Sequence, residues 1–270
     1  MIVATVVNAK GGVGKTTITG NLGYLLATQY GKKVLLIDLD SAANLSSFMD
    51  IQLAPNDKAG LTSVLSDTDN DIKEHIFKTR IENLDIIPCN QTLAAAEDRI
   101  RADIICPQQT RLLKQLDKVS SEYDYCIIDS TPSIGDSIRV INALACCDDV
   151  IIPCTPEADA ISGMGKVVDM ITKVKQNINP KLNIRGVVYT KVANMAFDRS
   201  VLDLKLQIPR FRTYIRECKK VAKESRATGL TFKEYDPKAK GTFDMDNFAA
   251  EYIGAEFPHP NYLPKELPLF

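Results

Sequence analysis

Two sequence features are absent from this chain, and each absence excludes a class of protein. No apolar run among its 270 residues is long enough to span a bilayer. The N-terminus has no basic region followed by an apolar segment and a small-residue cleavage site, so we interpret residues 2–7 as a buried strand and not as a signal peptide. We therefore expect a cytoplasmic protein with no membrane partner.

The seven cysteines contain no C-x-x-C pair, which argues against an iron–sulfur protein. Their odd number favours reduced thiols in a cytoplasm. The adjacent residues Cys146 and Cys147 are poorly spaced for chelating one metal ion. We interpret most of the cysteines as small buried apolar residues.

The net charge of −1 conceals a basic region. Residues 181–240 hold 15 Lys and Arg against 6 Asp and Glu, a local charge of +9, so the rest of the chain carries −10. A basic lobe on a mildly acidic protein indicates a polyanionic partner. A solvated face that binds nothing would have the same composition.

Apolar runs alternate with amphipathic stretches along the whole chain. The predicted strands cover residues 2–7, 34–40, 84–88, 125–129, 149–153 and 184–190. The predicted helices cover residues 16–30, 61–65, 93–101, 111–120, 138–146 and 163–176. Most strands are apolar on both faces, which is typical of a parallel sheet covered by helices on both sides. We predict an α/β fold with a doubly wound, mostly parallel sheet, in one domain over residues 1–256.

The tail over residues 257–270 is rich in proline. Pro258, Pro260, Pro264 and Pro268 allow neither a helix nor a central strand there. We expect an extended arm, either packed on the domain or disordered.

A glycine-rich stretch lies between the first predicted strand and the first predicted helix. There, backbone N–H groups converge and the helix dipole favours a bound anion. The strict phosphate-loop pattern G-x-x-x-x-G-K-[ST] fails because its first position is Ala9, but the variant K-G-G-x-G-K-[ST] matches. The stretch reads Lys10-Gly11-Gly12-Val13-Gly14-Lys15-Thr16-Thr17. Its second lysine can reach β- and γ-phosphates, and the threonine after it can ligate Mg²⁺.

Polar residues end several predicted strands, at the edge of the sheet where ligands bind in open α/β folds. Asp129 fits a carboxylate that holds a Mg²⁺-bound water opposite Thr16. Asp38 and Asp40 project the same way if their strand continues through both, so that one supports the metal and the other orients the attacking water. Thr190 ends the last of these strands.

Residues 210–226 are predicted to form a helix with a cationic stripe and an apolar stripe. A cationic stripe neutralises phosphates without reading sequence, although an ordinary surface helix has the same pattern. The stripe residues, spaced four and three apart, are Arg212, Arg216, Lys219, Lys223 and Arg226.

The variant loop with its additional Lys10 resembles the deviant Walker A motif of the ParA/MinD family of dimerising ATPases. The resemblance covers roughly residues 1–255 and implies a SIMIBI-like P-loop NTPase that hydrolyses ATP with Mg²⁺. It implies that Lys15 is catalytic in its own chain, while Lys10 reaches across a two-fold interface to the partner's nucleotide, as an arginine finger does. It also implies that Asp40 positions water and that Asp38 belongs to the Mg²⁺ shell.

Other segments match the family with departures. The family's Pro-Gln after the second aspartate is replaced by Ser41-Ala42-Ala43, and Ser130-Thr131-Pro132-Ser133 lacks one of two family prolines in a loop that senses γ-phosphate. By the same resemblance, Glu157 lies at the dimer face and Pro237 lies in a loop that borders the adenine.

The resemblance is closest to partition ATPases of the ParA/Soj type. It implies a homodimer with ATP that associates with the nucleoid by binding double-stranded DNA without sequence preference. It also implies a ParB-like centromere-binding protein that stimulates hydrolysis, so that plasmid or chromosome DNA is segregated. The implied DNA contacts are Arg212, Arg216, Lys219, Lys220, Lys223 and Arg226.

The alternative function is that of a MinD-like ATPase that cycles on a membrane. That branch ends in a basic amphipathic helix. Residues 251–257 of this chain are not basic and are followed by prolines, so we expect no membrane binding.

Overall fold

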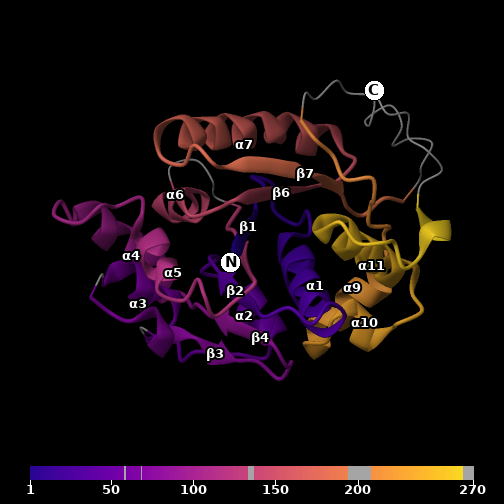
Figure 1. Ribbon diagram of the computed structural model, residues 1–270, viewed down its shortest axis with the longest axis horizontal. Coiled ribbons are helices and arrows are strands. Elements are labelled where there is room, and N and C mark those ends of the chain that lie inside the picture. The colour runs from indigo at the N-terminus through magenta and orange to yellow at the C-terminus, as the bar shows by residue number, and fades with distance from the viewer. Residues whose placement is uncertain (58, 68, 133–136, 194–207, 264–270) are drawn as a thin grey trace.

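The computed structural model describes residues 1–57, 59–67, 69–132, 137–193 and 208–263 (Figure 1). A seven-stranded sheet forms the centre of this part of the chain, in the order β3-β4-β2-β5-β1-β6-β7. All neighbouring strands are parallel except β3, which pairs antiparallel with β4 at one edge. The strands are β1 (Ile2–Val6), β2 (Val34–Asp38), β3 (Phe77–Lys78), β4 (Leu84–Ile87), β5 (Tyr125–Asp129), β6 (Asp149–Cys154) and β7 (Asn183–Tyr189).

Helices cover both faces of the sheet, as predicted (Figure 1). One face carries α1 (Lys15–Thr28), α2 (Asn44–Phe48), α9 (Lys219–Thr228), α10 (Phe232–Tyr235) and α11 (Lys240–Ile253). The other face carries α3 (Leu61–Ser66), α4 (Thr92–Ala102), α5 (Arg111–Asp117), α6 (Ile138–Ala145) and α7 (Ala158–Asn177). Two single 3₁₀ turns, η1 (Ile72–His75) and η2 (Pro260–Tyr262), complete the described elements.

The pattern of β2 explains why this sheet has two cores. All five of its residues are buried. Leu35 and Ile37 pack into one hydrophobic cluster, while Val34 and Leu36 pack into the other. Alternate side chains of a strand point to opposite faces, so a strand covered on both sides has to be apolar throughout.

Strand β1 lies in the interior of the sheet and pairs with β5 on one side and β6 on the other. In doubly wound sheets, the point where the strand order reverses leaves a crevice beyond the carboxyl ends of the strands. Residues 8–14, which follow β1, lie at this point. The predicted doubly wound, mostly parallel α/β fold is confirmed.

The predicted helix over residues 210–226 is wrong in its first half. The chain from Pro209 to Glu217 is extended and bonds to the edge of β7 and to the residues after it: Phe211 N donates to Val187 O at 2.9 Å and Ile215 N to Tyr189 O at 2.7 Å. Helix α9 begins only at Lys219.

The physical reason is the period of the buried side chains in this segment. Phe211, Thr213 and Ile215 are buried, while Arg212 is exposed and Tyr214 and Arg216 are half-buried, which is the two-residue period of a strand. The edge of β7 offers backbone carbonyl groups that an extended chain can bond to, and this favours the extended form over a helix. Arg212 and Arg216 therefore do not share a helical stripe with Lys219.

The first part of the proline-rich tail packs on α11. Asn247 Nδ2 donates to His259 O at 2.9 Å, and His259 N donates to Asn247 Oδ1 at 2.9 Å. This segment contains the short turn η2, which the proline count did not predict. Pro264 and Pro268 lie outside the described residues.

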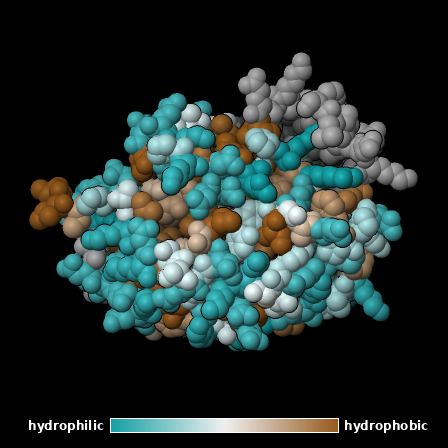
Figure 2. Space-filling view, viewed as in Figure 1, coloured by the Kyte–Doolittle hydropathy of each residue, from teal (hydrophilic) through white to brown (hydrophobic). Residues whose placement is uncertain are grey.

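The visible surface is mainly polar (Figure 2), and no helix in the described part of the chain is long and apolar enough to cross a membrane. An apolar projection stands out at the connection between α4 and α5 (Figure 2). Its residues, Ile104 and Ile105, are 92% and 89% exposed.

Candidate functional site

The loop after β1 is held in place by its own Asn8 side chain and by the Thr190 side chain, which follows β7. Asn8 Nδ2 donates to Pro153 O at 2.7 Å, and Lys10 N donates to Asn8 Oδ1 at 3.0 Å. On the far side, the Thr190 hydroxyl donates to Val13 O at 2.7 Å. Gly14 has a φ of +95°, a backbone conformation that other residues rarely adopt. Asn8 was missed in the sequence, although a buried amide between an apolar strand and a glycine turn was a signal.

Helix α1 begins at Lys15 and directs two functional groups towards the end of β5. The Thr16 hydroxyl donates to Asp129 Oδ2 at 2.6 Å. Lys15 is only 7% exposed, and burial lowers the pKa of its ammonium group, against the opposing influence of Asp129 and Asp40. A buried ammonium group at a helix N-terminus is ready to neutralise a bound anion.

The same residues fit a magnesium ion. Asp129 Oδ1 is buried and has no hydrogen-bond partner in the described structure, although its neighbour Oδ2 is bonded. Burial, with the charge of Asp38 beside it, raises the pKa of Asp129 well above its ordinary value. A cation would favour the charged form. Mg²⁺ takes oxygen ligands and keeps several waters, so the Thr16 hydroxyl with a water held by Asp129 suffices.

The Asp38 and Asp40 carboxylates do not project the same way, because β2 ends at Asp38 and does not continue through Asp40. Asp38 is fully buried and accepts hydrogen bonds from Asp40 N at 3.2 Å, Ser46 N at 2.8 Å and the Ser46 hydroxyl at 2.7 Å. Burial raises its pKa to about 6. Asp40 lies in the following turn and faces the cleft described below. Ser46, a further residue missed in the sequence, keeps Asp38 turned away from that cleft.

The segment after Asp129 first continues the pairing of β5 with β1. Ser130 N donates to Val6 O at 3.2 Å, and Pro132 lines the cleft. Ser133 lies outside the described residues.

A cleft of about 630 Å³ lies above these groups and has two walls. The first, here called the loop wall, consists of Gly11, Gly12, Gly14, Lys15, Thr16, Thr17, Asp40 and Thr190. The second, here called the α9 wall, consists of Lys219, Ala222, Lys223 and Arg226. Its three cations are spaced i, i+4 and i+7, so they share one helix face. Ile215, Phe232 and Met245 give the cleft an apolar floor.

The remaining predicted DNA contacts differ from the α9 wall. Arg216 also lines the cleft, but its guanidinium is bound to the Asp244 carboxylate, with Nη2 to Oδ1 at 2.5 Å. The Arg212 guanidinium lies 5.9 Å from the centre of the Phe257 ring. Lys220 is exposed and is not among the described residues that line the cleft.

Three predicted ligand-binding residues also lie outside the cleft lining, and one of them, Val13, is fully buried within the loop. Glu157 precedes α7 and forms an ion pair with Lys10, which holds the pKa of that carboxyl below its usual range. Pro237 is exposed in the link between α10 and α11. The structure thus brings together the loop, Asp40, Asp129 and Thr190. Glu157 contacts the front of this loop through Lys10, whereas Pro237 is not among the described residues that line the cleft.

Comparison with known sequences places this site in a family. The family model described as AAA domain, AAA_31, matches residues 1–184. The sporulation initiation inhibitor protein Soj of Bacillus subtilis strain 168 is 35% identical over 249 residues, covering 88% of this chain and 93% of that protein. An uncharacterised Mycobacterium tuberculosis (strain CDC 1551) protein is 38% identical over 184 residues, and the chain spans 56% of its length.

Solved structures agree with the sequence comparison. A Mycobacterium smegmatis protein named cobyrinic acid a,c-diamide synthase, with bound ADP and magnesium, superposes with a TM-score of 0.77 at 26% identity over 99% of this chain and 100% of its own. A Borrelia burgdorferi plasmid partition protein gives a TM-score of 0.67 at 28% identity over 88% of this chain and 98% of its own. With its variant phosphate loop and this topology, the chain belongs to the ParA/MinD family of P-loop ATPases.

Proposed function

We propose that this chain hydrolyses ATP at the loop wall, with Mg²⁺ held between Thr16 and Asp129. The unpartnered Asp129 Oδ1, buried beside the Thr16–Asp129 hydrogen bond, is the observation that carries the proposal. Backbone N–H groups of residues 11–17 would bind the phosphates, and Lys15 would neutralise them. Mg²⁺ at this site offsets the charge that builds on the phosphate oxygens.

Asp40 is the residue that orients water in this proposal. It faces the cleft, whereas Asp38 is buried behind it and pairs in register with Asp129 across β2 and β5. Asp38 would therefore act on the metal only through Asp129 and water. Positioning and charge neutralisation supply most of the catalysis in phosphoryl transfer, so these few groups are sufficient.

Lys10 would complete the site of a second copy of the chain. In the isolated chain its ammonium group is paired with Glu157, at the front of the loop. This pair is partly exposed, so exchanging it for phosphates of a second subunit's nucleotide requires little desolvation. ATP would thereby favour the dimer, and hydrolysis would favour its separation.

The α9 wall would bind double-stranded DNA without sequence preference when the dimer forms. Lys219, Lys223 and Arg226 share one helix face, and long cationic side chains suit phosphate contacts. The plasmid partition protein among the structural relatives supports a role in segregating DNA. A ParB-like partner that stimulates hydrolysis, and association with the nucleoid, complete this proposal.

The experiment measures phosphate release, dimer mass by light scattering and DNA retention, each with Mg-ATP, with Mg-ADP and after EDTA. We expect a Mg²⁺-dependent turnover and an ATP-dependent dimer that retains DNA. Vesicles of anionic lipid form a further arm, and ATP-dependent sedimentation with them in place of DNA would favour a membrane-cycling ATPase.

Lys10→Ala tests the role given to the second subunit. It should abolish dimerisation and hydrolysis while nucleotide still binds. Lys73→Ala is the matched control, because Lys73 also pairs with a glutamate, Glu122, on the surface. Normal turnover by Lys10→Ala would sink this part of the proposal.

A further inference from the structure

A buried arginine joins α6 to the backbone between Asp38 and Asp40. Arg139 lies at the start of α6, soon after the segment that follows Asp129. Its Nη1 donates to Leu39 O at 3.2 Å, a carbonyl that lies between Asp38 and Asp40. The residue is only 6% exposed. This contact couples the position of α6 to the backbone between Asp38 and Asp40.

Glu97 of α4 holds this arginine in place. Its Oε1 accepts hydrogen bonds from Arg139 Nε at 2.9 Å and from the Ser137 hydroxyl at 2.6 Å. These donors and the arginine charge lower the pKa of Glu97, although burial alone would raise it. The carboxylate is therefore charged at neutral pH and fixes both residues at the N-terminal end of α6.

The peptide before Asp40 is clamped on both sides. Leu39 N donates to Asp129 O at 2.9 Å, while Leu39 O accepts from Arg139. The next carbonyl, Asp40 O, accepts from the Cys89 thiol at 2.9 Å. These bonds restrict the backbone of Leu39 and Asp40. The Asp40 carboxylate, which faces the cleft, is therefore carried on a fixed backbone.

We propose that Arg139 is a positioning residue for hydrolysis: it fixes Leu39 O, and through it the Asp40 carboxylate, in register with the segment after Asp129. This inference rests on the proposed ATPase function. A movement of α6 when nucleotide binds would reach Asp40 through the contact of this guanidinium with Leu39 O. Misplacing a catalytic group by about 1 Å lowers rates by about 100-fold.

The molecule contains a matched control for this pair. Arg111 Nη1 donates to Leu65 O at 3.1 Å and Arg111 Nη2 to Asp103 Oδ2 at 2.5 Å. Its side chain is 2% exposed, against 8% for Arg139. Both arginines thus join a buried carbonyl to a partly buried carboxylate, and neither is among the described residues that line the cleft. They differ in the carbonyl they contact: Leu39 O precedes the cleft-lining Asp40, whereas Leu65 O lies in α3, which contributes no described residue to the cleft.

The test compares Arg139→Met with Arg111→Met in the full chain, by urea midpoint, affinity for a fluorescent ATP analogue, and kcat and KM for Mg-ATP. Both variants should lose stability. Only Arg139→Met should lower kcat, by about 10- to 100-fold, with nucleotide affinity nearly unchanged. Arg139→Lys, which keeps a donor, should recover part of the loss. Hydrogen exchange of residues 39–44 should respond to ATP in Arg111→Met and not in Arg139→Met.

Glu97→Gln keeps the test decisive if Arg139→Met does not fold. It retains an acceptor and removes the charge, so kcat should fall by a smaller factor with affinity retained. The inference would be overturned if Arg139→Met or Glu97→Gln had the same kcat as the wild type. Absence of turnover in the wild type would instead overturn the proposed function.

Discussion

On the loop wall, functional side chains are fixed by buried contacts from several elements, whereas the cations of the α9 wall extend from one short helix into solvent. Thr16 reaches Asp129 at 2.6 Å and Thr190 reaches Val13 at 2.7 Å. On the α9 wall, the Lys219 side chain is 83% exposed and its ion pair with Glu217 spans 3.5 Å. The difference suits two chemistries, because phosphoryl transfer depends on fixed geometry and non-specific phosphate binding depends mainly on charge.

The largest effect should come from the loop wall. Thr16→Ala removes both a Mg²⁺ ligand and the hydrogen bond to Asp129, so we expect kcat for Mg-ATP to fall by about 100- to 1,000-fold. Thr28→Ala is the control at the other end of α1, where the hydroxyl donates to Tyr24 O, within the same helix. Phosphate release would measure both. Equal rates for the two variants would show that the fixed contact between Thr16 and Asp129 is not needed for hydrolysis.

Arg216 lines the same cleft as the α9 wall but should behave as part of the fixed structure. Its partner Asp244 has a side chain 2% exposed, and removing the arginine leaves a buried carboxylate without its cation. We expect Arg216→Ala to lower the free energy of unfolding by about 3 kcal/mol. Urea denaturation would measure the change.

Arg212→Ala is the control for that change, since Arg212 lies in the same segment and contacts a ring instead of a carboxylate. Its effect should stay below about 1 kcal/mol. The double variant Arg216→Met/Asp244→Leu should recover much of the loss, because both charges are then absent. Equal destabilisation by the two single variants would show that the Asp244 pair carries no special weight.

The α9 wall should affect salt dependence more than structure. Replacing Lys219, Lys223 and Arg226 by Gln removes three phosphate contacts, so the slope of log K for DNA against log salt should fall by about 2.7. Lys166, Lys173 and Lys175 on α7 are exposed and provide a control triple with the same change in charge. Fluorescence anisotropy of labelled duplex DNA at several salt concentrations measures the slope. If the α7 triple changed the slope as much, net charge and not the α9 wall would determine DNA binding.

The sequence identified the loop wall because its residues are close together or end apolar strands. Lys15 and Thr16 need only a strand, a turn and a helix in order, and Asp129 needs only to end an apolar strand. Those elements formed as expected. The contacts of Arg139 and Ser46 join distant parts of the chain, and no local pattern reports such pairs. Residues 210–217 were wrongly predicted to be helical because a strand period and a helix period both fit a short run of mixed residues.

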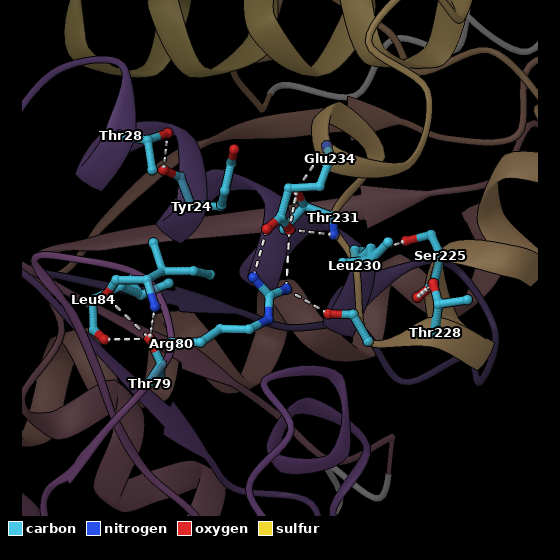
Figure 3. Close-up of polar contacts among 12 residues, drawn as sticks. Tyr24, Thr28, Thr79, Arg80, Leu84, Ser225, Thr228, Leu230, Thr231 and Glu234 are labelled. Carbon is cyan, nitrogen blue, oxygen red and sulfur yellow. Dashed lines mark hydrogen bonds and ion pairs between the residues drawn. The ribbon is translucent and has the colours of Figure 1, made fainter.

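The smallest effect should come from the strut that supports the far end of α9. Arg80, in the turn between β3 and β4, donates to both Glu234 oxygens and to Gly229 O just beyond α9 (Figure 3). Burial would raise the pKa of Glu234, but the donors from Arg80 and Thr231 outweigh it and lower that pKa. Glu234→Gln should therefore reduce the free energy of unfolding by about 0.5 to 1 kcal/mol at neutral pH.

The sign of the pH dependence follows from that lowered pKa. The stabilisation is complete above the unfolded carboxyl pKa of about 4.3 and is lost as the pH falls through the lower folded value. The difference in urea midpoint between wild type and Glu234→Gln should thus close in acid, while Glu82→Gln, an exposed carboxylate on the same turn, should match the wild type throughout. A gap that persists in acid would mean that the strut acts by packing. A reduced DNA affinity in Glu234→Gln at neutral pH would then show that even the α9 wall needs fixed geometry at its base.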